Sequence, residues 1–291
     1  MSLVINHNLM AMNAARSLSI SYGRLATSVQ RLSSGLRINS AQDDAAGLAV
    51  REMMRTDIRV LNQGVRNAND AVSMIQTADG ALSVIDEKLT RMKELAEQAA
   101  TGTYTTAQRL IMDSEYQAMA SEITRIATAT DFNGVKLLDG TLSGTAVDGT
   151  QQMKVHFGTG NSSAEDYYYV KIDKATASAL GVGSGAGTGA GSTISTQSAA
   201  QVALAAIDSA IATKDNIRAN LGALANRLTN TVSVLSIQAE NLQAAESRVS
   251  DVDVAVEMTE FTRNQILTQA AVSMLAQANA LPQLALQLIG G

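Results

Sequence analysis

The hydrophobic residues near the start of the chain are spaced by alternating steps of four and three, which is the spacing of a coiled-coil seam. This spacing predicts a helix that packs against a second helix along one apolar stripe. We expect the helix to end near Ser34 and Gly35, because glycine is the usual residue after a helix C-terminus. The stripe consists of Leu18, Tyr22, Leu25, Val29, Leu32 and Leu36.

Two further helices are predicted farther along the chain. The sequence "TTAQ" at residues 105–108 has the form of a capping box and predicts a helix over residues 106–129. Before it, residues 41–100 repeat the spacing of four and three, which predicts one long helix. Its stripe contains Leu61, Val65, Ala68, Val72 and Ile75 and, after one shorter step, Ala78, Leu82, Ile85, Leu89, Met92 and Ala96.

The stretch "RLSSGLRINSAQDDAAGLAV", residues 31–50, joins the first two helices and holds two arginines and two adjacent carboxylates. It has three interpretations: a catalytic loop, an anion site, or a turn. Ser40 to Asp43 has the form of a capping box, which would start the second helix at about Ala41 and place Asp43 and Asp44 in its first turn. Because neighbouring residues on a helix do not face each other, a catalytic pair of carboxylates is disfavoured. We interpret the stretch as a joint between helices.

The middle of the chain predicts β-hairpins within about residues 131–175. "DFNGVKLLDG" carries Asn133-Gly134, the strongest short hairpin signal, and "QMKVHFG" and "DYYYVKI" have the composition of two paired strands. Residues 181–198, "GVGSGAGTGAGSTISTQS", are of low complexity, and we predict a flexible segment that tolerates replacement. Helical spacing then returns over about residues 199–247 and 253–288.

The predicted fold class is mainly α, with a long antiparallel coiled-coil-like helical bundle formed by both chain ends and small β-hairpins in between. A long helix with one apolar stripe needs a partner in water, so the two ends should pair. Residues 1–42 contain four arginines and no acidic residue, whereas residues 251–291 contain four acidic residues and one arginine. Opposite charges favour contact between these segments; two independently solvated faces are the alternative.

The tail after Arg263, "NQILTQAAVSMLAQANALPQLALQLIGG", contains no charged residue. A helix on a protein surface normally carries charges opposite its apolar stripe, so this helix is expected to be buried among other helices. One chain cannot supply those neighbours, and other copies must complete the core. The predicted subunit-assembly residues are Leu18, Leu25, Leu32 and Leu36 near the start and Leu267, Ala271, Met274, Leu275, Ala278 and Leu281 near the end.

Composition and motifs argue against most kinds of catalytic, metal-binding and nucleic-acid-binding site. Cysteine is absent and only two histidines occur, without an HExxH pattern, so no thiol nucleophile or zinc-protease site is predicted. The glycine-rich segment lacks the lysine of a phosphate loop. A net charge of −5 disfavours nucleic acid as a partner. No apolar run is long enough to insert into a membrane, and no secretory signal peptide is visible. We predict no enzyme, cofactor or metal site.

The passages "RLSSGLRINSAQDDAAGLAV", "NANDAVSMIQTADGALSVI", "DFNGVKLLDG" and "ILTQAAVSMLAQANALPQLALQLI" closely resemble bacterial flagellin. The resemblance covers about residues 1–175 and 197–291. It implies a subunit of the extracellular flagellar filament, with an inner helical domain of residues 1–44 and 252–291 and a second domain of residues 45–251. The joint would be the spoke between these domains, formed by Gly35, Arg37, Asn39, Asp43 and Asp44.

The resemblance also implies partners. These are other copies of the chain, the filament cap, the hook–filament junction proteins, an export chaperone on the C-terminal helix, and the flagellar type III export apparatus. A host receptor of the Toll-like class is implied as well, since the family's contact positions match Arg91, Leu95 and Glu115. The alternative is that Arg91 and Glu115 are ordinary exposed charges and that Leu95 is a packing residue.

Three other functions compete with a filament subunit. A hook–filament junction protein shares the terminal helices, but not the match through the middle of the chain. A cytoplasmic coiled-coil signalling bundle explains the heptads, yet leaves the uncharged tail and the β region unexplained. A secreted enzyme lacks catalytic groups.

Overall fold

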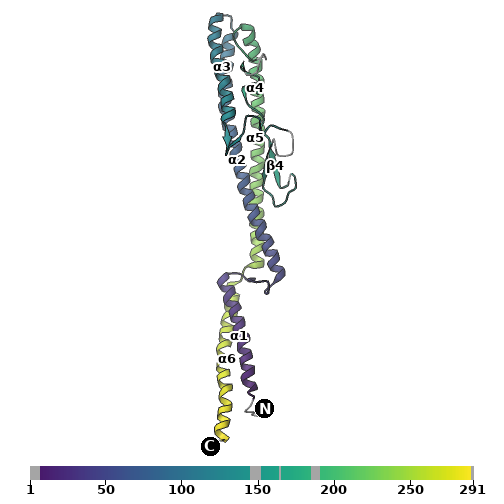
Figure 1. Ribbon diagram of the computed structural model, residues 1–291, viewed down its shortest axis with the longest axis vertical. Coiled ribbons are helices and arrows are strands. Elements are labelled where there is room, and N and C mark those ends of the chain that lie inside the picture. The colour runs from purple at the N-terminus through teal and green to yellow at the C-terminus, as the bar shows by residue number, and fades with distance from the viewer. Residues whose placement is uncertain (1–6, 145–151, 164, 185–190, 290–291) are drawn as a thin grey trace. The chain divides into compact units, whose positions relative to one another are not determined.

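A computed structural model describes residues 7–144, 152–163, 165–184 and 191–289, and of residues 281–289 it describes the backbone alone. The fold is mainly α, as predicted (Figure 1). The chain divides into two compact units, which we call the terminal unit (residues 1–58 and 240–291) and the middle unit (residues 59–239). The described elements are α1 (Leu9–Ser34), α2 (Ala45–Ala100), α3 (Thr106–Ala129), β1 (Asp131–Phe132), β2 (Val135–Lys136), β3 (Met153–His156), β4 (Tyr167–Val170), α4 (Ala177–Leu180), α5 (Gln197–Ser250) and α6 (Val254–Ile289).

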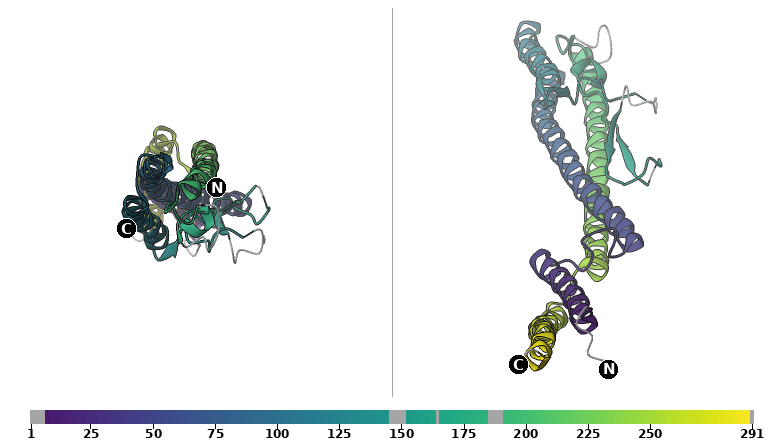
Figure 2. Two further views of the ribbon diagram at one scale, coloured as in Figure 1. Left: turned by 90° about the horizontal axis from the view of Figure 1, so that it is seen from above. Right: turned by 60° about the horizontal axis from the view of Figure 1, so that its bottom comes forward.

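The middle unit has a continuous apolar core in which α2 and α5 run antiparallel, and Figure 2 shows these helices side by side. The predicted spacing on α2 is confirmed, with one correction. Gly64 and Ala71 occupy the buried positions, while the predicted Val65 and Val72 are half-buried beside them. With Gly64 and Ala71 in place of Val65 and Val72, the alternating steps of three and four residues continue along α2 without the shorter step. The buried stripe of α2 is Leu61, Gly64, Ala68, Ala71, Ile75, Ala78, Leu82, Ile85, Leu89, Met92, Ala96 and Ala99.

The predicted cap of the third helix is confirmed. Thr105 and Gln108 form a reciprocal capping box at the start of α3. One turn later the buried Arg109 donates from Nε to the carbonyl of Ala99 at 2.8 Å and from Nη2 to that of Thr101 at 2.7 Å. A cation bound to the last carbonyls of a helix stabilises its C-terminus, so Arg109 fixes the turn from α2 into α3.

Both predicted hairpins are confirmed. Strands β1 and β2 pair antiparallel around Asn133 and Gly134, which have positive φ of 51° and 80°, as a two-residue hairpin turn requires. Strands β3 and β4 pair in a second hairpin. The backbone of Phe157 lies so close to Gly64 that a Cβ there would be 2.0 Å from its carbonyl oxygen, which excludes any larger residue at this point of α2.

The prediction of a flexible segment over residues 181–198 is wrong for its described parts. Val182 and Ile194 are fully buried. The Tyr116 hydroxyl donates to the carbonyl of Gly191 at 2.8 Å, and burial raises the pKa of Tyr116 to about 12. Asp113 accepts hydrogen bonds from Thr193 Oγ1 and the Ile194 amide. These residues therefore belong to the core of the middle unit, and residues 185–190 lie outside the described part.

Candidate functional site: the surface of the terminal helices

Helices α1 and α6 form the antiparallel pair that the sequence predicts, and they lie side by side in Figures 1 and 2. At one end Asn8 caps α1 by accepting from the amide of Ala11, and its Nδ2 donates to the carbonyl of Ala278 at 2.7 Å. Nearer the other end Arg31 lies 3.6 Å from the buried carboxylate of Glu257. Of the arginines in residues 1–42, Arg31 thus pairs with an acidic residue of α6, as charge complementarity predicts.

The contact between α1 and α6 is made largely by small and polar side chains. The predicted Leu18, Leu25 and Leu32 are half-buried in it, but Tyr22 and Val29 are 54% and 49% exposed. Their place in the seam is taken by serines, so the predicted assignment of the stripe is wrong at these two positions. The seam positions of α6 are the buried Glu257, Asn264, Thr268 and Ala278 and the half-buried Ala271 and Leu275; those of α1 include the buried Ser28 and the half-buried Ala14 and Ser21.

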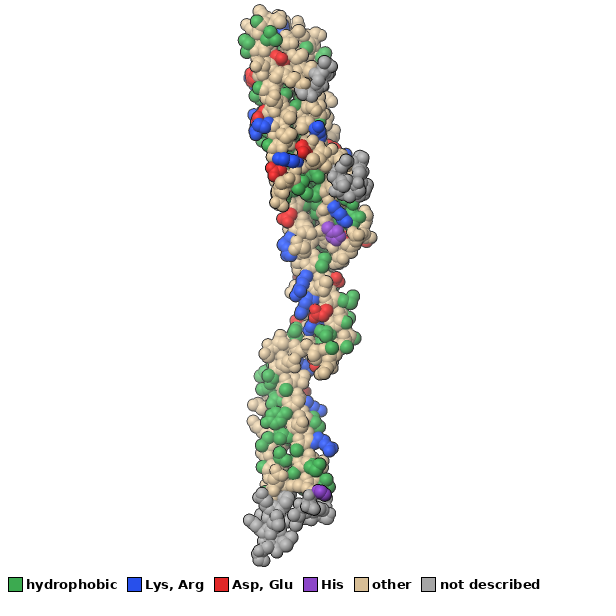
Figure 3. Space-filling model, in the orientation of Figure 1, with side chains coloured by type: hydrophobic (Ala, Val, Ile, Leu, Met, Phe, Trp, Pro, Cys, Tyr) green, Lys and Arg blue, Asp and Glu red, His purple; other side chains and the backbone are tan. Residues whose placement is uncertain are grey.

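Many large apolar side chains of the two helices instead point outward. In the terminal unit, the buried hydrophobic residues with described side chains are Ile38 and Ala278 alone. On the face shown in Figure 3, hydrophobic side chains gather over α1 and α6. Since a surface of this kind is typical of a protein interface, we call it the outward face. Its residues are Leu9, Met10, Met12, Ile20, Tyr22 and Val29 on α1 and Val254, Val256, Met258, Ile266, Leu267, Val272 and Met274 on α6.

The predicted assembly residues of α6 therefore fall into two groups. Ala271, Leu275 and Ala278 face α1, whereas Leu267 and Met274 are 45% and 63% exposed on the outward face. The side chain of Leu281 lies outside the described residues. Leu36 lies past the end of α1 and forms a β-bridge with Asp251.

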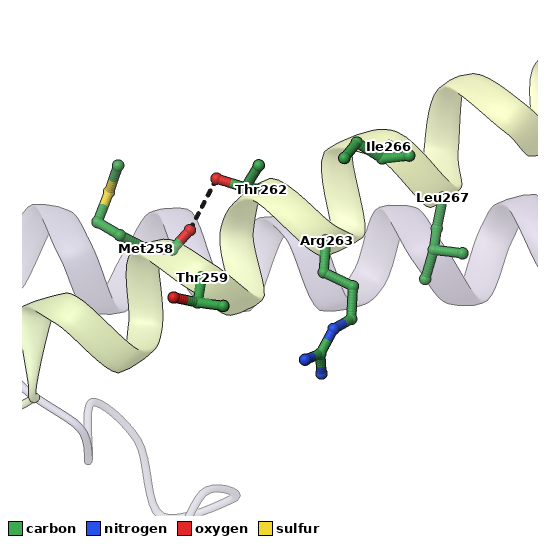
Figure 4. Close-up of a pocket in the computed structure, with 6 residues that line it drawn as sticks. All are labelled: Met258, Thr259, Thr262, Arg263, Ile266 and Leu267. Atoms are coloured by element: carbon green, nitrogen blue, oxygen red, sulfur yellow. Dashed lines mark hydrogen bonds between the residues drawn. The ribbon is translucent and has the colours of Figure 1, made fainter.

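Two shallow hollows mark the outward face. One, of about 590 Å³, runs between α1 and α6 and is lined by Met10, Leu267 and Met274, among others. The other, of about 540 Å³, lies along α6 (Figure 4). There Met258 and Ile266 flank Thr262, whose hydroxyl donates to the Met258 carbonyl at 2.9 Å, so the polar group is satisfied within the helix. Apolar hollows on helices suit the side chains of another helix.

The joint between α1 and α2 is held by backbone contacts with residues 249–252. Gly35, with φ of 72°, ends α1 as predicted, and its carbonyl accepts from the amide of Val252. Arg37 donates from its amide to the carbonyl of Ser250 and from its guanidinium to that of Val249. Asn39 donates from Nδ2 to the carbonyl of Leu36. The joint is therefore a fixed structure within the terminal unit.

The predicted capping box at Ser40 and Asp43 is wrong. Helix α2 begins at Ala45, and Asp44 caps it by accepting from the amide of Gly47 at 2.9 Å. Asp43 closes the preceding turn: its carboxylate accepts from the amides of Ser40 and Asn39, which hold its pKa below the usual value. The two carboxylates have separate structural roles, and this confirms the interpretation of the stretch as a joint.

The sequence does not predict the role of Arg51, which stabilises this joint. Its guanidinium is buried and donates to the carbonyl of Ile38 at 2.6 Å and to Glu52. Ile38 is itself 1% exposed. A charged residue on a helix normally predicts an exposed position, so the burial of Arg51 shows only in the structure.

The residues predicted as receptor contacts lie in the middle unit. Arg91 is exposed and makes ion pairs with Glu115 and Glu94, both at 2.9 Å. Leu95 is 2% exposed and packs in the core. Arg91 and Glu115 therefore present polar groups to solvent, whereas Leu95 is a packing residue, in agreement with the alternative given for it.

A ladder of ion pairs, also absent from the sequence-based predictions, joins α2 and α5. Lys93, Asp86 and Asp79 on α2 pair with Asp208, Lys214 and Arg218 on α5 at 2.6, 2.5 and 2.7 Å. Lys214 is 2% exposed and occupies a core position. Burial alone would lower the pKa of Lys214, but hydrogen bonds and charges of Asp215 and Asp86 outweigh it and raise the pKa.

The ladder sets the register of the two helices. Sliding α5 by one heptad in one direction would bring Lys93 to Lys214, and sliding it in the other would bring Asp86 to Asp208. Either shift places like charges together, which disfavours the wrong register. A lysine at a heptad position between Ile207 and Leu221 is the signal that could have indicated this site.

We expect Asp86→Lys to lower the free energy of unfolding by on the order of 2 kcal/mol, because it places a second cation beside the buried Lys214. This is less than the cost for a fully buried pair, since the Asp86 side chain is 40% exposed. The measurement is urea unfolding followed by far-ultraviolet circular dichroism. The same change in a Lys214→Met background is the control and should cost far less. Equal losses of unfolding free energy in both backgrounds would show that the ion pair of Asp86 and Lys214 does not stabilise the middle unit.

The described residues contain no cluster of three or more histidine or acidic side chains that could hold a metal ion. Within the same residues, no helix has the length and hydropathy that crossing a membrane requires. The arrangement of the site is that of a surface for helix packing.

Comparisons with known proteins agree with this arrangement. Family models for the bacterial flagellin N-terminal and C-terminal helical regions match residues 5–143 and 204–289. A flagellin of Halalkalibacterium halodurans is 44% identical, covering 99% of this chain and 100% of the relative. A flagellar filament 30.7 kDa core protein of Treponema maltophilum is 40% identical with the same coverage. A solved hook-associated protein of Vibrio parahaemolyticus shares the fold, with a TM-score of 0.56 at 17% identity over 72% of this chain and 100% of its own.

Proposed function

Because the chain belongs to the bacterial flagellin family, it is a structural subunit of the flagellar filament, and we propose that α1 and α6 hold that polymer together. The observation that carries the proposal is the distribution of apolar side chains. The middle unit has a continuous buried apolar core, whereas the terminal unit buries only Ile38 and Ala278 among its described hydrophobic side chains and exposes many of its large ones. Burying this outward face between subunits would stabilise the polymer at roughly 25 cal/mol per Å² of apolar surface.

We propose further that residues 1–44 and 252–291 form the inner domain of the filament and residues 45–251 the second domain. The uncharged sequence of α6 supports this division, since a charge-free helix suits the interior of an assembly. In the same proposal Gly35, Arg37, Asn39, Asp43 and Asp44 form the spoke. The hydrogen bonds within this segment support a folded rather than an unstructured connection.

The partners that belong to this proposal are those of a filament subunit. They are the cap, the hook–filament junction proteins, the export apparatus, which would act without a cleaved signal peptide, and a chaperone that covers α6 before export. The exposed apolar residues of α6 support the need for such a cover. For a Toll-like receptor, the exposed pair of Arg91 and Glu115 supports a polar contact.

Seeded polymerisation tests the function directly. We expect purified protein to grow into long tubes from filament fragments, visible by electron microscopy and accompanied by loss of soluble subunits. A junction protein, the alternative within the family, would bind the fragment ends and stop there. Added protein that leaves the fragments unchanged in length would therefore contradict a filament subunit.

A further inference from the structure

The hollow between α1 and α6 contains two methionines from different helices. Met10 of α1 is 49% exposed and Met274 of α6 is 63% exposed, and both line the hollow of about 590 Å³ together with Leu267. Ala14, Ala271 and Ala278 form its apolar floor. The methionines of the middle unit's core differ, since Met74 and Met92 are 1% and 0% exposed. The free subunit thus presents two accessible thioethers at one place on its outward face.

We propose that Met10 and Met274 are a site of reversible oxidation that blocks polymerisation of the free subunit. The inference rests on the proposed function, in which a second copy of the chain covers this hollow. The oxidant is hydrogen peroxide. A sulfur lone pair attacks one peroxide oxygen, the S–O bond forms as the O–O bond breaks, and the displaced oxygen leaves as water with both protons. The sulfur loses two electrons, which the peroxide gains.

Methionine sulfoxide at these positions is incompatible with the proposed contact between subunits. A sulfoxide is a polar hydrogen-bond acceptor that water solvates, whereas four alanines, a leucine and the two methionines line most of the hollow, beside Asn13, Ser17, Ser21 and Gln277. Covering it with another helix would displace the water that solvates this acceptor, which is unfavourable. In the polymer the same two methionines would be shielded from peroxide. The site therefore acts before assembly, and a methionine sulfoxide reductase would restore it.

The experiment treats wild-type subunits and preformed filaments with hydrogen peroxide and maps sulfoxides by peptide mass spectrometry. Met10 and Met274 should be oxidised in subunits and protected in filaments. Oxidised subunits should show a critical concentration for polymerisation at least about tenfold higher, and reductase treatment should reverse the rise. The double variant Met10→Leu/Met274→Leu removes both sulfur atoms, so peroxide should raise its critical concentration, relative to the same variant untreated, far less than it raises that of wild type.

The matched control is Met12→Leu/Met53→Leu, which removes two methionines that are exposed outside the hollow and should remain sensitive to peroxide. Equal sensitivity of the two double variants, or normal polymerisation of oxidised wild type, would overturn the inference. Failure of untreated wild type to polymerise would instead contradict the proposed function, so the two failures are distinguishable.

Discussion

Removal of residues 264–291 is expected to abolish polymerisation while leaving the middle unit folded. The deletion takes away most of α6, including Leu267 and Met274 on the outward face and the partners of α1 in the seam. The core of the middle unit loses nothing, because its buried residues lie between Leu61 and Ala239. Sedimentation after seeding should find all of the truncated protein in solution.

The folding of the truncated chain is the control for this result. Its urea unfolding transition, followed by circular dichroism, should have the same midpoint as that of the middle unit in the full-length chain. Filaments of normal length from the truncated chain would show that the C-terminal helix is dispensable, and the account of the terminal unit would then be wrong.

The second large effect is expected for Leu275→Asp. Leu275 is half-buried where α6 packs against α1, so a carboxylate there would lose solvation without gaining a cation. An open helical polymer repeats each interface defect in every subunit. We expect the critical concentration for polymerisation to rise at least about tenfold, which corresponds to about 1.4 kcal/mol.

Lys174→Asp in the middle unit is the matched control. Lys174 is exposed, and its replacement places the same carboxylate on a surface that the proposed contacts do not use. The critical concentration of this variant should stay within about twofold of wild type. Equal increases for the two variants would mean that the effect arises from added charge rather than from the contact of α6.

Much of the fold follows from the sequence because the relevant signals are local. The heptad spacing of α2, the capping box at Thr105 and the turn at Asn133-Gly134 each fix a conformation within a few residues. The start of α2 was missed because Ser40 and Asp44 both precede plausible first turns. The hydrogen bond from Gly47 to Asp44 decides between them.

The terminal seam could not be predicted from the usual rule that apolar residues face the nearest partner. At residues 21 and 22 this rule selects tyrosine, yet Ser21 faces α6 and Tyr22 points outward. The same reversal occurs at Ser28 and Val29. A sequence does not state which of two adjacent faces meets a helix of its own chain, so the positions of the seam become known only in the structure.

The prediction that residues 181–198 are flexible was wrong for a different reason. Glycine and serine dominate residues 181–198, and they mask Val182 and Ile194, which anchor its two ends in the core. Lys214 was missed because a charge in an apolar stripe normally predicts an exposed position. Its partners Asp86 and Asp215 come from two helices, and only their convergence makes the burial favourable.

The central claim is that the terminal helices acquire most of their stability from other subunits. Amide hydrogen exchange of residues 9–34 and 254–280, measured in free subunits and in filaments, tests it most directly. The account predicts rapid exchange in the free subunit, because small and polar side chains form most of the seam, and strong protection in the filament. Residues 61–99 should be protected in both states. Equal, strong protection of the terminal helices in free subunits and filaments would contradict the account.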